Sequence, residues 1–267
     1  MELRDRVAVI TGGSGGIGRA LARAFLDEGA RAVVLADLDA GAVEAAAGEI
    51  NAAVGGDRCA GLVCDVTDES QVAELVEATL EAHGPIDLFC SNAGSGAEGV
   101  LLDAPNESWD QQWNLHVMAH LYAARAVVPS MVANGGGYLL NTASAAGLLA
   151  AIGSGPYTVT KAAAVKLAEF LSITHGDDGI RVSVLCPQGV NTAMAPRSLG
   201  DGQTDGIIEP DELARVTVEA IGEERFHVLP HPEVADYLKR KADDPDRWLR
   251  GMRRLRARSL DLTEGGS

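Results

Sequence analysis

Short apolar runs alternate with longer segments of helical periodicity along most of this 267-residue chain. Seven runs rich in β-branched and apolar residues predict strands. They read "RVAVITG", "AVVLAD", "GLVCDV", "IDLFCSNAG", "GYLLNTAS", "IRVSVLCP" and "RFHVLP". The segments between them have helical spacing, and one of them, "DESQVAELVEATLEAHG", is amphipathic, opens with an Asp or Ser cap and closes on Gly84. The longest such segment covers about residues 106–132. Strands that alternate with helices pair in parallel through right-handed crossovers.

The strands are apolar along their whole length, as expected where both faces of a sheet are covered by helices. The pattern therefore predicts an α/β fold of three layers (αβα), with a parallel sheet between helices. No Pro/Ser-rich linker divides the chain, so we expect a single domain over residues 1–267, with a core over about 3–230 and a helical tail over 231–267. The segment Ala193–Ile208 is long for a connection and rich in Gly, Ser and Asp, which is typical of a lid.

The charge is strongly and unevenly acidic. A formal net charge of −16 makes the chain a poor partner for nucleic acid or an anionic membrane. Between Lys239 and Arg258, however, nine Lys or Arg stand against three Asp. This basic tail is expected to be a terminal helix that packs on the acidic body or on a neighbouring subunit.

The four cysteines are scattered and form no C-x-x-C pair. Buried thiols in a reducing cytosol are the expectation, which makes the protein cytoplasmic. Charged residues directly follow Met1, with no apolar signal region, and no run of 18 apolar residues predicts a membrane span.

Glycines lie between the first strand and the first helix. Gly12, Gly16 and Gly18 form the pattern T-G-x-x-x-G-x-G in "TGGSGGIG". Glycine there permits a tight turn and lets the backbone approach a pyrophosphate, which then lies on the amide-rich N-terminus of the helix. The position between a strand and a helix is the context that this interpretation requires.

The second strand ends in Asp37. A carboxylate at this place accepts hydrogen bonds from ribose hydroxyls and repels a 2′-phosphate, for which a basic residue would be needed. Neither the glycine turn before Arg19 nor the segment just after Asp37 supplies one. The sequence therefore predicts NAD(H) rather than NADP(H).

Tyr157 and Lys161 stand four residues apart, so they share one face of a predicted helix. An ammonium close to a phenol favours the phenolate and is expected to lower the tyrosine pKa. Such a pair makes a proton donor and acceptor that works near neutral pH. A partly buried tyrosine beside a solvated lysine is the simpler interpretation of this pair alone.

Several ordered motifs together resemble the short-chain dehydrogenase/reductase family over about residues 3–230. They are the glycine turn, "CDVT", "SNAG", Asn114 in "WNLHV", Ser144 thirteen residues before Tyr157, and the Y-x-x-x-K pair itself. The resemblance implies a Rossmann-type doubly wound parallel sheet. It also implies cofactor contacts at Gly12, Ser14, Gly16, Ile17, Gly18, Asp37, Leu38, Asp65, Val66, Asn92, Ala93, Gly94, Tyr157, Lys161, Pro187, Gly189, Val190 and Thr192.

The resemblance also assigns roles in catalysis. Tyr157 exchanges the substrate hydroxyl proton, Lys161 lowers the tyrosine pKa, and Ser144 orients the substrate oxygen. Asn114 holds a water that links Lys161 to solvent. Taken singly, Ser144 could instead cap a turn and Asn114 could be a polar residue that bends its helix.

Two departures from the family pattern concern the substrate. Pro187-Gln188-Gly189 replaces the usual P-G, so an amide side chain comes near the expected substrate, and the basic tail replaces a Gly-rich end. The tail is expected to cover the cleft or pack on another subunit. The expected substrate contacts are Ser144, Ala145, Ile152, Tyr157, Gln188 and Met194.

His116 and His120 lie four apart on a predicted helix and could bind a metal, but no third ligand has a familiar spacing, so we expect no metal site. Trp109, Trp113 and Tyr122 on the same helix fit core or subunit-interface packing. In the family this helix and the Tyr157 helix commonly form a contact between subunits, which implies a homotetramer or a homodimer.

The function expected from these observations is an NAD-dependent oxidoreductase that interconverts a secondary alcohol and a ketone. The residues expected around the cleft are mostly small or apolar, and no Arg or Lys is placed to bind a substrate carboxylate or phosphate, which favours a lipophilic small molecule. A non-catalytic protein that senses nicotinamide on the same fold is the main alternative. Epimerase or dehydratase chemistry on nucleotide sugars is a third, although such relatives are usually longer.

Overall fold

A seven-stranded, wholly parallel sheet forms the centre of the computed structural model, which describes residues 1–96, 100–194 and 205–264. The strand order is β3-β2-β1-β4-β5-β6-β9. The strands are β1 (Val7–Thr11), β2 (Ala32–Asp37), β3 (Cys59–Val63), β4 (Leu88–Ser91), β5 (Gly137–Thr142), β6 (Ile180–Leu185) and β9 (His227–Val228). All seven predicted strands are confirmed, and the fold is the expected Rossmann-type α/β fold.

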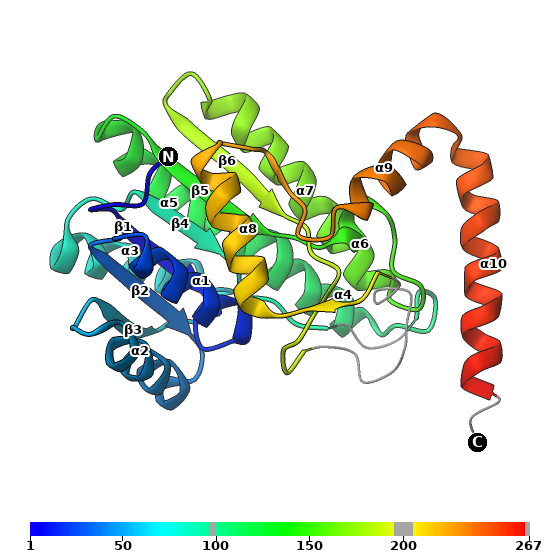
Figure 1. Ribbon diagram of the computed structural model, residues 1–267, viewed down its shortest axis with the longest axis horizontal. Coiled ribbons are helices and arrows are strands. Elements are labelled where there is room, and N and C mark those ends of the chain that lie inside the picture. Colours follow the sequence, from blue (N-terminus) through cyan, green and yellow to red (C-terminus); the bar gives the residue numbers. More distant parts are fainter. Residues whose placement is uncertain (97–99, 195–204, 265–267) are drawn as a thin grey trace.

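Helices cover both faces of this sheet and bury two separate apolar cores (Figure 1). On one face lie α1 (Gly16–Asp27), α2 (Ala40–Val54) and α8 (Pro210–Gly222). On the other lie α3 (Glu69–His83), α5 (Ala119–Ala133) and α7 (Gly155–His175). Along β5, Tyr138 and Leu140 enter the first core, whereas Leu139 enters the second, because successive side chains of a strand point to opposite faces.

The helix expected over about residues 106–132 is interrupted. It consists of α4 (Asn106–Trp113), the π-helical turn η1 (Asn114–Met118) and α5. In η1 the amide of Ala119 donates to the carbonyl of Asn114, one residue further away than in an α-helix. Single π turns inside α-helices are frequent at functional sites, and this one rearranges the side chains that face α7.

The segment after β6 contains a two-residue strand pair that the sequence did not predict. β7 (Gly189–Val190) pairs in parallel with β8 (Ile207–Ile208). Residues 195–204 of the expected lid lie outside the described residues, so the lid stays a prediction.

The tail is helical, as expected, and forms α9 (Glu233–Asp243) and α10 (Pro245–Glu264). Lys241 ties α9 to the body: its Nζ donates to the carbonyls of Leu148 and Leu149 over 2.6 and 3.1 Å. Val234 of α9 is fully buried in the core. Beyond α9, α10 projects away from the sheet (Figure 1).

The sheet reverses its winding between β1 and β4, which are neighbours although two strands separate them in sequence. From β1 the chain moves outward through β2 to β3, and from β4 it moves the other way through β5 to β6. Such a reversal opens a crevice at the carboxyl ends of the strands, where α/β proteins bind ligands. Among the described helices, none is long and apolar enough to cross a membrane.

Candidate active site

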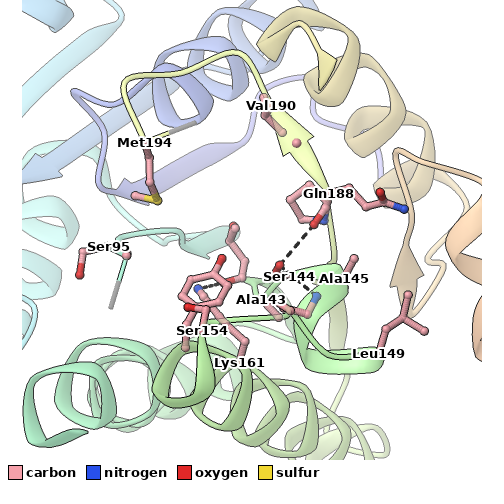
Figure 2. A pocket seen from close by; sticks show the side chains of 18 of the residues that line it. Ser95, Ala143, Ser144, Ala145, Leu149, Ser154, Lys161, Gln188, Val190 and Met194 are labelled. Carbon is pink, nitrogen blue, oxygen red and sulfur yellow. Dashed lines mark hydrogen bonds between the residues drawn. The ribbon is translucent and has the colours of Figure 1, made fainter. Parts of the chain in front are cut away.

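A cleft of about 1500 Å³ lies at this edge of the sheet. Its lining joins the glycine turn after β1, the ends of β2, β4 and β5, the helices α6 (Ala145–Leu148) and α7, the β7 segment and the tail helices. Figure 2 shows Ser144 and Lys161 at the centre of its side chains, with Ser95, Gln188 and Met194 around them. Except for Asn114, every residue that the sequence assigned to the site lines this cleft.

Two glycines make the turn after β1 possible. Gly12 has a φ of +63°, and a Cβ there would lie 2.9 Å from the Ala93 Cα. A Cβ on Gly18 would lie 2.4 Å from the Gly12 carbonyl oxygen, a distance that only a shift of the backbone could relieve. The turn is therefore closed so tightly that only glycine fits at either position.

The N-terminus of α1 opens into the cleft without a side-chain cap, because its N-cap residue is Gly15. The first amides of a helix have no partner within the helix, and they carry its positive dipole end. Uncapped amides at a glycine turn match the needs of a pyrophosphate. Thr192 packs on the same turn, since a Cβ on Gly16 would lie 2.8 Å from its Cγ2.

The carboxylate of Asp37 faces the glycine turn. Its Oδ2 accepts hydrogen bonds from the amide of Ser14 over 3.0 Å and from the hydroxyl of Ser14 over 2.5 Å, while its Oδ1 accepts from the Leu38 amide over 2.8 Å. Among the described lining residues, all the basic side chains belong to α7 and the tail helices. They are Lys161, Arg240, Arg247, Arg254 and Arg258. Within the described part of the lining, the Asp37 end of the cleft therefore carries a carboxylate and no basic side chain.

Asn92 joins three strands where the sheet reverses. Its side-chain amide donates to the carbonyl of Thr11 over 3.0 Å, and its Oδ1 accepts from the hydroxyl of Thr142 over 3.1 Å. The backbone amide of Asn92 donates to the Thr11 hydroxyl over 2.9 Å. Asn92 therefore holds the ends of β1, β4 and β5 at fixed spacing beneath the cleft.

Ser144, Tyr157 and Lys161 meet at the inner end of the cleft. Ser144 caps α6, since its Oγ accepts from the Ala146 amide over 3.1 Å. The alternative that Ser144 caps a turn therefore holds as well. Lys161 is 3 % exposed, and its Nζ donates to the Thr142 carbonyl over 3.0 Å. The ammonium lies 5.7 Å from the centroid of the Tyr157 ring.

The expectation that Lys161 lowers the tyrosine pKa is wrong for this arrangement. Burial raises the pKa of Tyr157, and the hydrogen bond with Ser144 opposes this only in part. Burial also lowers the pKa of Lys161 to about 8. The ammonium lies against the ring and bonds to Thr142, so it gives the phenol oxygen little of the stabilisation that an adjacent charge provides.

The assignment of Asn114 to the site is also corrected. Its side chain is exposed at the start of η1 and does not line the cleft. Instead, Gln112, His116 and His120 are buried at intervals of four residues. Gln112 Nε2 donates to the Ser95 hydroxyl over 3.1 Å and to the Gly96 carbonyl over 2.9 Å, which positions the loop after β4.

On the substrate side, Ala145, Ile152, Gln188 and Met194 line the cleft as expected. The Gln188 amide is held in place, since its Nε2 donates to Asp205 Oδ2 over 2.7 Å. Tyr237 of α9 donates to the other oxygen of Asp205 over 2.8 Å.

The tail contributes to the cleft, which is one of the two placements that the sequence led us to expect. Trp248, Met252 and Leu255 of α10 line the outer cleft at helical spacing, beside the arginines named above. The expectation that the cleft offers no Arg or Lys to an anionic group is therefore wrong. The apolar residues at helical spacing within the basic tail indicated that one face of this helix packs on other residues. Only the fold shows that this face lines the outer cleft.

The four cysteines are free and buried, as expected. Within residues 1–96, 100–194 and 205–264, no group of three His, Cys, Asp or Glu side chains is arranged to hold a metal ion.

Comparison with known proteins agrees with this geometry. The family model described as short chain dehydrogenase matches residues 6–201. The chain is 34% identical over 252 residues to 1-deoxy-11-beta-hydroxypentalenate dehydrogenase of Streptomyces exfoliatus, covering 91% of this chain and 90% of that protein. It is 34% identical over 221 residues to 2-(R)-hydroxypropyl-CoM dehydrogenase of Xanthobacter autotrophicus, covering 82% and 86%.

A solved structure is similar over nearly the whole chain. It is a short chain dehydrogenase/reductase from Burkholderia phymatum in complex with NAD, with a TM-score of 0.83, 32% identity and coverage of 92% of this chain and 96% of that one. The chain belongs to the short-chain dehydrogenase family. It is an oxidoreductase that acts on CH–OH groups.

Gly18→Ala tests the glycine turn. The new methyl group collides with the Gly12 carbonyl, so we expect the variant to bind NADH at least about tenfold more weakly, by fluorescence titration. Gly48→Ala in α2 is the matched control, because a Cβ there meets no atom within 4 Å. Equal NADH affinity in the two variants would contradict the role given to the turn.

Proposed function

We propose that this protein is an NAD(H)-dependent dehydrogenase/reductase that interconverts a secondary alcohol and a ketone on a mainly apolar small molecule. The observation that carries the proposal is the meeting of Ser144, Tyr157 and Lys161 at the inner end of a cleft whose far end is formed by the glycine turn and Asp37. The dehydrogenase names of the relatives, and NAD in the similar structure, support the same reaction class.

The residues present fit NAD. The uncapped N-terminus of α1 would hold the pyrophosphate, and Asp37 would accept hydrogen bonds from the ribose hydroxyls. Val66 would contact the adenine, and Val190 and Thr192 would lie near the carboxamide and the pyrophosphate. When bound, the nicotinamide supplies hydride transfer to or from the carbinol carbon.

The protein's own residues handle the proton. Ser144 orients the substrate oxygen and stabilises the charge that develops on it. Because burial raises its pKa, Tyr157 holds its proton at neutral pH and can donate it to a ketone oxygen. In the oxidation direction the same oxygen must accept the proton as phenolate, and the hydrogen bond with Ser144 favours that form.

The lining indicates an apolar substrate body. Leu149, Ile152, Met194 and Trp248 offer apolar surface around the reacting group. The arginines of the tail stand at the outer cleft, where a substrate with an acidic end group would also be accommodated.

We propose that the protein is cytoplasmic. We also propose that it forms a homotetramer. Phe170 and Ile173 on α7 are 64 % and 77 % exposed, and Val159 on the same helix is 45 % exposed. Trp113 at the end of α4 is also 45 % exposed. Exposed apolar side chains gathered on neighbouring helices are typical of a subunit contact.

A panel of substrates tests the reaction. We expect the protein to oxidise 2-octanol or 1-phenylethanol with NAD, followed by NADH absorbance, with a higher kcat/KM than with NADP because Asp37 repels a 2′-phosphate. A higher kcat/KM with NADP would contradict the cofactor assignment. Absence of turnover with every alcohol and ketone, despite NADH binding, would favour a sensor that binds nicotinamide without catalysis.

Tyr157→Phe tests the proton transfer. Loss of the hydroxyl removes the general acid and base, so we expect kcat to fall by about 10²–10⁴-fold while NADH still binds. Tyr122→Phe, on α5 and away from the cleft, is the matched control and should keep wild-type kcat. Near-wild-type turnover in Tyr157→Phe would remove the mechanism.

Light scattering at micromolar concentration tests the assembly. We expect a tetramer, and we expect Phe170→Asp to shift it towards smaller species because a carboxylate cannot be buried unpaired in an apolar contact. Val63→Asp, at an exposed apolar position on the edge strand β3, is the control. A monomeric wild-type protein would refute the proposal.

A further inference from the structure

His116 lies where the sequence led us to expect Asn114. Its side chain is fully buried, and its ring meets that of Tyr157 edge to face, with centroids 5.5 Å apart and an interplanar angle of 88°. Thr160 lies on its other side, one residue before Lys161 on α7. His116 therefore touches the proton-transfer tyrosine, whereas Asn114 faces away from the cleft.

The hydrogen bonds around the imidazole determine which nitrogen carries the proton. The Ser95 amide donates to Nε2 over 3.3 Å, so Nε2 is an acceptor. The hydroxyl of Thr160 donates to the Pro156 carbonyl over 2.9 Å, and it therefore accepts from Nδ1, which is 3.0 Å away. His116 is thus the neutral Nδ1–H tautomer with a lone pair on Nε2.

The lone pair of His116 and the ammonium of Lys161 reach the same space. A Cβ built on Gly94 would lie 3.4 Å from His116 Nε2 and 3.5 Å from Lys161 Nζ. Because residue 94 is glycine, that space is left to these two groups. The negative end of the imidazole dipole therefore faces a space that also borders the buried cation, and it favours the charged form of Lys161.

The surroundings keep His116 neutral. Burial, together with smaller contributions from Lys161 and His120, lowers its pKa to about 2. The pKa of His120 is likewise lowered to about 3 by burial and by Lys161. Neither nitrogen of His120 has a hydrogen-bond partner among the described residues, and buried polar groups of this kind are usually satisfied by ordered water.

We propose that His116 is a positioning residue for Lys161 and Tyr157, and that it takes the role expected of Asn114. Its neutral Nε2, which accepts from the Ser95 amide, turns the negative end of the imidazole dipole to the space beside Gly94 that the Lys161 ammonium also borders, while its ring packs against the Tyr157 ring and holds it in place. This inference rests on the proposed function, since it concerns the same proton transfer.

The acceptor has a consequence for pH dependence. The titratable groups that face Lys161 are Tyr157, His116, His120 and Cys186. Loss of an acceptor disfavours the ammonium, so the pKa of Lys161, already about 8, falls further. Ketone reduction needs a protonated Tyr157 beside a charged Lys161, so activity should then decline at lower pH than in the wild type.

Kinetics of ketone reduction provide the first test, with 2-octanone or acetophenone, whichever turns over faster. His116→Leu removes the acceptor, and we expect kcat to fall about 10- to 100-fold, with the alkaline limb of its pH profile moved to lower pH. His116→Asn keeps an acceptor and should recover most of this loss. His83→Leu on α3, outside the cleft, should behave as wild type.

Asn114→Ala tests the rival assignment. We expect its loss of kcat to be at least about tenfold smaller than that of His116→Leu, with an unmoved pH profile. The inference is overturned if Asn114→Ala is as damaging as His116→Leu, or if His116→Leu keeps wild-type kcat and pH profile. Should His116→Leu fail to fold, judged by thermal melting, His116→Phe, which keeps a ring but removes the acceptor nitrogen, takes its place in this comparison.

Nitrogen-15 NMR of the whole enzyme with labelled histidine gives a readout that needs no turnover. The signal lost in His116→Asn should be that of a neutral Nδ1–H tautomer, unchanged between about pH 6 and 9. A protonated ring or an Nε2–H tautomer would overturn the inference. If the tautomer is as stated but no substrate turns over, the proposed function fails while the geometry of His116 stands.

Discussion

The structure of the site depends on keeping one ammonium charge buried. Lys161 is almost completely enclosed, and a charge in such surroundings is costly unless it finds hydrogen-bond acceptors. The carbonyl of Thr142, at the end of β5, is the acceptor that the structure gives it. The groups that face Lys161 are accordingly neutral near pH 7: burial keeps Tyr157 protonated and His116 unprotonated. Burial thus sets the protonation of the groups around this one charge.

A different constraint shapes the cofactor end of the cleft, where the backbone at Gly12 and Gly18 lies too close to neighbouring backbone for any side chain. The turn at Gly12 and Gly18 is so tight that it leaves the first amides of α1 open to the cleft. Asn92 ties this turn's strand to β4 and β5, so the glycine turn and Lys161 are held by the same strand ends. The reversal of the sheet therefore fixes the distance between the nucleotide end and the proton-transfer end.

The sequence pattern predicted correctly those features that depend on interactions between residues close together in the chain. The strands were predicted because burial on both faces demands continuous apolar runs. Tyr157 and Lys161 were predicted because four residues make about one helical turn. Asn114 was assigned wrongly because its place in the motif was taken to give its orientation, as it would on a regular α-helix. A π turn begins at Asn114, and His116 is buried where this turn packs against α7. Neither feature could be predicted from the sequence pattern.

The sequence by itself determined the class of fold, the glycine turn and the tyrosine–lysine pair, since each follows from periodicity or spacing within a short segment. The family resemblance came from several such motifs in order along the chain. Only the tertiary structure decided that Lys161 bonds to Thr142, that burial outweighs its charge at the Tyr157 phenol, and that tail arginines such as Arg247 line the cleft. These features join residues far apart in the chain. Their energies depend on distance and burial, which no linear pattern records.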